Sequence, residues 1–142
     1  MPKLSPNSWQ AEYNLASALQ QQGDLDGAIQ HFRSALRMNP QHLESHNNLG
    51  VALEEKGDWQ AARREFESGI GINPKDERSH LNLGLLLARQ GMIGKAVEEL
   101  QTAVSLKPDD PTAAYALRLA GKVQRDLQSA HQADQPHGSN PQ

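Results

Sequence analysis

The sequence predicts an all-α protein in which one helical unit is repeated three times, and three observations support this prediction. The same residue types recur at a constant step of 34 residues along most of the chain. Within each step, apolar residues recur at three- and four-residue spacing, the pattern of a helix with one buried face. Glycines and prolines recur at the same step and divide each unit into two helices.

The repeat is visible in several residue types at once. Asn-Leu-Ala at 14–16 recurs as Asn-Leu-Gly at 48–50 and again at 82–84. Glycine, alanine and proline follow at the same step, in the three sets Gly23, Gly57, Gly91; Ala28, Ala62, Ala96; and Pro40, Pro74, Pro108. So many agreements identify an internal repeat. We expect units at 9–42, 43–76 and 77–110, after an N-terminal extension at 1–8.

Each unit is predicted to hold two helices with defined ends. In the second unit, Gly57 ends the first helix in the left-handed region, and Asp58 caps the second helix. Pro74 stops that helix, because the residue before a proline avoids the helical conformation. The first helix buries His46, Leu49 and Leu53, and the second buries Ala62, Phe66, Gly69 and Ile70. In the third unit Met92 replaces the capping aspartate, so that helix should begin less firmly.

A small residue recurs inside each first helix, as Ala16, Gly50 and Gly84. Glycine costs a helix interior roughly 0.5–1 kcal/mol relative to alanine. We expect close approach of the two helices of a unit to require it, since packing usually outweighs propensity.

The segment 111–130 is predicted to be a helix that caps the last unit. Pro111 suits the first helical position, and a terminal cap needs a polar outer side. The apolar face expected to pack inward consists of Ala113, Leu117, Ala120, Val123 and Leu127. The polar tail at 131–142 is expected to be disordered.

The repeat resembles the tetratricopeptide repeat, whose signature is W-x2-L-G-x2-Y, then A-x3-F, then P. The matching residues of the second unit are Leu49-Gly50, Ala62, Phe66 and Pro74, while His46 and Leu53 depart from the signature. The resemblance implies a right-handed α-solenoid whose first helices line a concave groove. It also implies a non-enzymatic adaptor that binds an extended or helical segment of another protein.

Three asparagines, Asn14, Asn48 and Asn82, fall on equivalent positions of the first helices. An amide offers both a donor and an acceptor, which suits the backbone of an extended peptide. The alternative is that these asparagines contact neighbouring helices or fit the consensus of the fold. By the same register, the groove wall is expected to include Gln10, Tyr13, Ser17, Glu44, Asn47, Val51, Arg78, Leu81, Leu85 and Arg89.

Family members that bind the acidic C-termini of chaperones use a clamp of Lys, Asn, Asn, Lys and Arg. The corresponding residues here are Tyr13, Ser17, Asn48, Arg78 and Asn82. Only Asn48 matches, and Arg78 keeps the charge. We therefore predict that the chain does not bind such a tail with high affinity.

Composition narrows the remaining classes of function. Net charge is −3 and no long basic run occurs, so we expect no nucleic-acid partner. The absence of cysteine excludes disulfides and thiolate metal sites. No signal sequence or apolar run of about 18 residues is seen, so a soluble, cytoplasmic protein without membrane insertion is expected.

We expect no cofactor, metal or catalytic residue. His46 and His80 are assigned to packing, because two histidines lack the third ligand that zinc requires. Glu54, Glu55, Glu65 and Glu67 are interpreted as solvated helix faces. The second hypothesis for function is a structural protein that assembles with itself through its solenoid ends, where Trp9 either makes such a contact or packs on the first helix.

Overall fold

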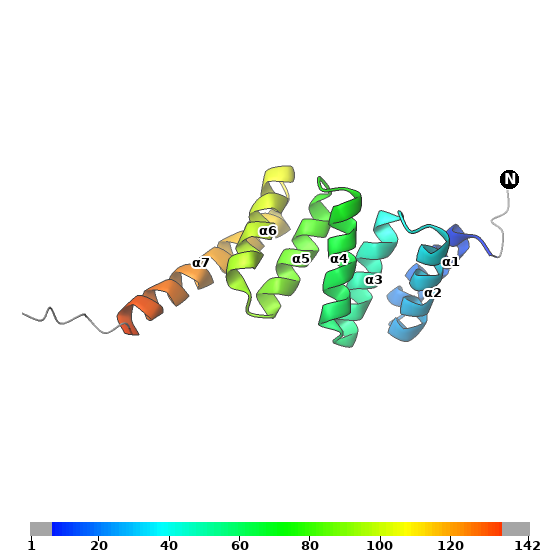
Figure 1. The fold of residues 1–142 in the computed structure, drawn as a ribbon, viewed down its shortest axis with the longest axis horizontal. Helices are drawn as coiled ribbons and strands as arrows, with labels where there is room; N and C mark the ends of the chain where they lie inside the picture. The colour runs from blue at the N-terminus through cyan, green and yellow to red at the C-terminus, as the bar shows by residue number, and fades with distance from the viewer. Residues whose placement is uncertain (1–6, 135–142) are drawn as a thin grey trace, which may run out of the picture.

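The computed structural model describes residues 7–134, which form seven α-helices and, in this range, no strand. The helices are α1 (Trp9–Gln21), α2 (Leu25–Met38), α3 (Leu43–Lys56), α4 (Trp59–Ile72), α5 (Glu77–Arg89), α6 (Ile93–Leu106) and α7 (Pro111–Asp134). They form three helical hairpins stacked side by side, and α7 follows the last hairpin (Figure 1). The all-α helical-repeat solenoid expected from the sequence is confirmed.

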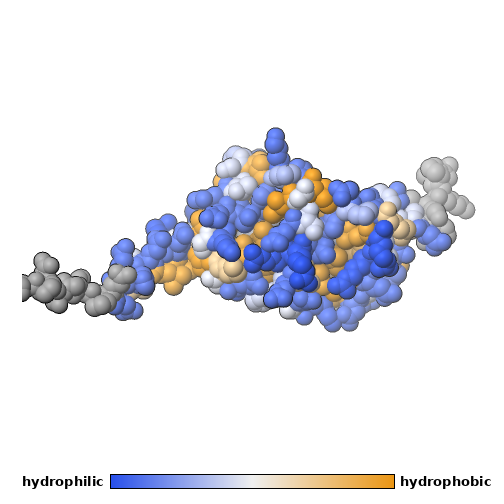
Figure 2. Space-filling view, viewed as in Figure 1, coloured by the Kyte–Doolittle hydropathy of each residue, from blue (hydrophilic) through white to orange (hydrophobic). Residues whose placement is uncertain are grey.

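The stack has an inner and an outer layer. The first helices α1, α3 and α5 contact one another in succession, and α5 also contacts α7. The second helices α2, α4 and α6 each contact the helices before and after them, but within residues 7–134 they do not contact one another. The first helices are therefore closer together, and they line the inner side of the curved stack together with α7. Figure 2 shows the face that carries α2, α4 and α6, where hydrophilic residues predominate.

The helix ends follow from local chemistry. Gly23, Gly57 and Gly91 adopt φ angles of +85°, +90° and +80°, a backbone conformation that residues with a Cβ rarely adopt. Asp58 accepts a hydrogen bond from the backbone N–H of Ala61 at 3.2 Å and so caps α4. The start of α6 at Met92 has no side-chain cap, as the sequence predicted.

The core is centred on one large side chain from each second helix, namely Phe32, Phe66 and Leu100, which are at most 1% exposed. A Cβ built on Gly50 would lie 2.4 Å from Cε1 of Phe66. A Cβ on Gly84 would lie 2.8 Å from Cγ of Leu100. Both distances are too short for a real contact, so close approach explains these glycines.

The last helix departs from the prediction in two ways. It continues to Asp134 and thus includes four residues that were expected in a disordered tail. Residues 1–6 and 135–142, which hold most of the predicted extension and tail, lie outside the described range. Ala113 and Ala120 are buried as expected, but Val123 and Leu127 are 42% and 56% exposed. Their assignment to the inward face was wrong, because the C-terminal half of α7 runs past the last hairpin (Figure 1).

Candidate functional site

The asparagine ladder lies on the first helices, with one residue each on α1, α3 and α5. Asn14 is exposed, and Asn48 and Asn82 are half-buried. Within residues 7–134, none of the three side-chain amides makes a hydrogen bond. Gln20 reaches Asn48 at 3.3 Å, but it donates to the backbone carbonyl and leaves the side chain unengaged.

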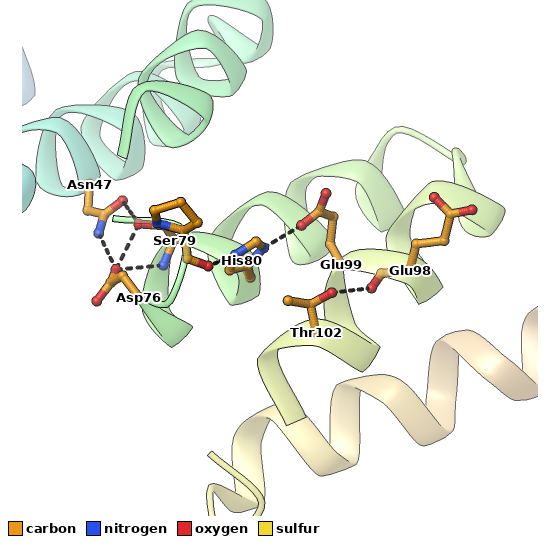
Figure 3. Close-up of polar contacts among 8 residues, drawn as sticks. Asn47, Asp76, Ser79, His80, Glu98, Glu99 and Thr102 are labelled. Carbon is orange, nitrogen blue, oxygen red and sulfur yellow. Dashed lines mark hydrogen bonds and ion pairs between the residues drawn. The ribbon is translucent and has the colours of Figure 1, made fainter. Parts of the chain in front are cut away.

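The prediction that Asn47 lines the groove was wrong. Asn47 is 1% exposed and lies between α3 and α5 (Figure 3). Its amide nitrogen donates to Asp76 at 3.3 Å, and its amide oxygen lies 3.1 Å from the hydroxyl of Ser79. Asp76 also caps α5 through the backbone N–H of Ser79. Asn47 is thus a buried link between two units, because its side chain points along the stack and not into the groove.

Four of the predicted groove residues line one polar pocket of about 280 Å³, together with Glu54 and Glu55. The four are Val51, Asn82, Leu85 and Arg89. Arg89 forms an ion pair with Glu54, whose side chain is only 11% exposed. The assignment of Glu54 to a solvated face was therefore wrong, whereas Glu55 is exposed as expected. The signal that could have placed Glu55 in the groove is the 34-residue step, since Arg89 is its equivalent in the third unit.

An apolar pocket of about 330 Å³ continues from the polar one, and the two share Leu85. Its other wall is α7, which contributes Tyr115, Leu119 and Val123. These three were not predicted as site residues. The 34-residue repeat could have predicted them, because Tyr115, Leu119 and Val123 are equivalent to Leu81, Leu85 and Arg89 of the third unit.

The remaining predicted residues divide between packing and exposure. The ring of Tyr13 lies 4.8 Å from that of His42 and 6.1 Å from that of Phe32. Leu81 packs against the apolar cluster between α6 and α7. Gln10 and Ser17 are half-buried, whereas Glu44 and Arg78 are exposed. Tyr13 and Leu81 therefore help to hold neighbouring first helices together.

Histidine–carboxylate pairs join the two helices of each unit. Nδ1 of His46 lies 2.7 Å from Glu65, and its Nε2 lies 2.8 Å from the carbonyl oxygen of Pro40. His80 repeats this geometry with Glu99 and the carbonyl of Pro74 (Figure 3). The first unit reverses the order, with Glu12 on the first helix and His31 on the second. Glu65 is thus paired, and its assignment to a solvated face was wrong.

The contacts of His46 favour its charged form. Burial opposes the charge, but the hydrogen bonds with Glu65 and the Pro40 carbonyl outweigh burial, so the pKa of His46 is raised. Both neighbours are acceptors, and only a protonated imidazole can donate to both. His46 and His80 therefore have structural partners, and no cluster of three metal-ligating side chains is found within residues 7–134.

Each end of the stack has one further close contact, between Glu77 and Asp110 at one end and between Trp9 and His42 at the other. Burial, followed by the nearby Asp110 at the start of α7, raises the pKa of Glu77 to about 7. At the other end, the ring of Trp9 lies 4.5 Å from that of His42. Trp9 thus has a partner on the loop before α3, which favours packing over an end-to-end contact.

The described helices include none that is long and apolar enough to cross a membrane. Among curated proteins, no sequence relative matches this chain. Solved structures with the same fold include the first TPR domain of Spaghetti (RPAP3) bound to the HSP90 peptide SRMEEVD. That structure has a TM-score of 0.80 and 14% identity, and the match covers 86% of this chain and 97% of that one.

Two other structures are similar to the chain. The Arabidopsis OM64 TPR domain has a TM-score of 0.78 and 18% identity, with 81% of this chain and 95% of that one covered. MamA has a TM-score of 0.79 and 26% identity, with 86% and 72% covered. Two family models described as tetratricopeptide repeat match residues 13–77 and 53–120. The chain belongs to the tetratricopeptide repeat family and is a protein–protein interaction module.

Proposed function

We propose that the chain binds an extended segment of another protein along its first helices, and that Asn14, Asn48 and Asn82 hold the backbone of that segment. The observation that carries this proposal is the contrast between two adjacent residues. Asn47 is buried and hydrogen-bonded on both sides of its amide, whereas the side-chain amides of Asn48 and its two equivalents make no hydrogen bond with any residue in 7–134. This contrast supports the ligand-binding interpretation of the ladder over a role in hydrogen bonding between helices.

The ladder suits a backbone because each amide can donate to a peptide C=O and accept from a peptide N–H. If each hydrogen bond contributes about 1 kcal/mol net, three contribute about 3 kcal/mol. That corresponds to roughly two decades of affinity. Recognition of this kind places little demand on the side chains of the partner, so specificity has to come from the pockets beside the ladder.

The test compares two triple variants with the wild type in affinity capture from the source lysate, read by quantitative mass spectrometry. The first replaces Asn14, Asn48 and Asn82 by alanine. The matched control replaces three exposed amides of the second helices by alanine, namely Gln30, Gln60 and Gln101. We expect partners to be lost only with the asparagine variant at equal helicity by circular dichroism. Partners that persist with it would make the ladder structural and refute the proposal.

The prediction that the chain does not bind a chaperone tail with high affinity can be checked by a peptide titration. The similar RPAP3 domain is bound to the peptide SRMEEVD, but this chain has Tyr13, Ser17 and Asn82 where the chaperone clamp needs Lys, Asn and Arg. We expect no saturable binding of SRMEEVD at micromolar concentration. Micromolar affinity for SRMEEVD would overturn this part of the proposal.

We propose that the inner face formed by the first helices has a binding role and not an enzymatic one. The polar pocket contains an ion pair, an amide and one further carboxylate, which are groups that bind and orient a ligand. The alternative of self-assembly through the solenoid ends has less support, because Trp9 already packs against His42.

A further inference from the structure

We propose that the bound segment carries a large apolar side chain next to a basic one, with the apolar side chain against α7 and the basic one at Glu55. This inference rests on the proposed function and names the chemistry of the partner. Two connected pockets on the inner face carry it, the apolar pocket between α5 and α7 and the polar pocket between α3 and α5.

The apolar pocket is more hydrophobic than a terminal helix requires. A cap normally turns a polar side to solvent. Here Tyr115, Leu119 and Val123 are 56%, 48% and 42% exposed, and they stand one turn apart along α7. The face of α7 where a further second helix would pack is instead closed by a charged residue, Arg118, which is exposed. The free end of the solenoid is thus polar, while the inner face of its last helix is apolar.

The location of these residues indicates what covers them. Leu119 and Val123 are the equivalents of Leu85 and Arg89, which line the polar pocket with Asn82, so these apolar residues continue the inner face that carries the asparagine ladder. A segment held by the ladder and extended past Asn82 meets Leu85 first and then α7. An apolar side chain placed there would be removed from water together with Leu119 and Val123, which favours binding.

The described residues that line the polar pocket include two carboxylates, Glu54 and Glu55, and one cation, Arg89. Glu54 is neutralised by Arg89, but Glu55 makes no hydrogen bond or ion pair within the described residues. Asn82 lines the same pocket and offers its amide to the backbone of the segment. A Lys or Arg side chain of the partner complements the free carboxylate, and an acidic side chain would be repelled by it.

The two pockets share Leu85, so their occupants must be close in the partner sequence. An apolar and a basic side chain within a few residues of each other on one segment satisfy both pockets at once. A second copy of this chain is the competing occupant of the apolar face, and the experiment below separates the two.

The probe is a phage-displayed library of random twelve-residue peptides, selected on the immobilised full chain. We expect the wild type to enrich peptides with a large apolar residue a few positions from Lys or Arg. Glu55→Lys should retain the apolar preference and replace Lys or Arg by Asp or Glu. Leu119→Asp should lose the apolar preference. Glu98→Lys, a charge reversal on the exposed surface of α6, is the matched control and should select as the wild type does.

A switch in preference is informative because an unfolded variant would not produce one. A synthetic peptide of the wild-type motif should bind Glu55→Lys at least about tenfold more weakly than wild type or Glu98→Lys. Unchanged peptides from Glu55→Lys or from Leu119→Asp would overturn the inference. So would sedimentation showing a wild-type dimer that Leu119→Asp dissociates, because a second copy would then cover the apolar face.

The proposed function and this inference fail in different ways. If the asparagine variant loses all selected peptides while Glu55→Lys and Leu119→Asp select unchanged, the ladder stands and the partner chemistry is wrong. If the asparagine variant selects the same peptides with the same affinity as the wild type, the ladder itself is wrong.

Discussion

The glycine inside α3 gives the sharpest test of the packing argument. Replacing Gly50 by alanine adds one methyl group in a helix interior, where alanine is favoured by about 1 kcal/mol. The new Cβ would lie 2.4, 2.7 and 2.9 Å from three atoms of the Phe66 ring. Phe66 is 0% exposed, so its ring has no solvent-filled space to move into.

The balance of the two effects predicts a loss of stability. Overpacking a core typically costs about 1–3 kcal/mol, and three short contacts with a buried ring place this site near the upper end. Subtracting the propensity gain leaves a net loss of about 2 kcal/mol for Gly50→Ala. With roughly 4 °C per kcal/mol for a chain of this size, the Tm should fall by about 8 °C.

Gly71→Ala is the matched control. Gly71 lies in α4, is exposed, and has nothing within 4 Å of a built Cβ. Alanine there should leave stability unchanged or raise it by about 0.5 kcal/mol. Thermal melts followed by circular dichroism compare the two variants directly. If Gly50→Ala melts at or above the temperature of Gly71→Ala, close approach of α3 and α4 does not explain the glycine.

Three further predictions concern single side chains, and denaturant unfolding checks each. Asp58→Ala removes the cap of α4 and should lower the unfolding free energy by about 1 kcal/mol. The raised pKa of His46 means that its contribution to stability is full below the unfolded pKa and is lost as pH rises through the folded one, so His46→Gln should destabilise more at pH 5.5 than at pH 8.5. Glu77 has its pKa raised to about 7, so native Glu77 holds its proton where the unfolded chain has lost it, and stability falls as pH rises from 4.5 to about 7. Relative to wild type, Glu77→Gln should therefore gain stability over that range, and a difference that does not change with pH would refute the assignment.

The features that the sequence predicted correctly are those that depend on neighbours within one unit. The glycine at 57 and the aspartate at 58 act on their own helix ends, so local patterns suffice to find them. The role of Gly50 is not visible from its own helix, because the side chain that requires a glycine there, Phe66, lies on the other helix of the hairpin. The repeat made this contact predictable, since a small residue at the same position of three units indicates that each unit makes the same close contact there.

The inner face of α7 was missed because two apolar stripes run along the same helix. One stripe, with Ala113 and Ala120, packs on the third unit, and the other, with Tyr115 and Leu119, stays exposed. Helical periodicity identifies both but does not distinguish them, because burial depends on where the previous hairpin ends. The register of the repeat does distinguish them, since it assigns 115 and 119 to the positions of Leu81 and Leu85.

The adjacent residues Asn47 and Asn48 show why site residues are harder to predict than the fold. One residue turns the side chain by about 100° around the helix, which here separates a buried link from a free amide. The equivalents of Asn47 are Tyr13 and Leu81, and all three contact the following first helix or its surroundings. These packed residues fix how far apart the first helices stand. They therefore also set the spacing of Asn14, Asn48 and Asn82 along the stack. Asn47, which was wrongly assigned to the groove, thus acts on the inner face indirectly, by holding neighbouring first helices in register.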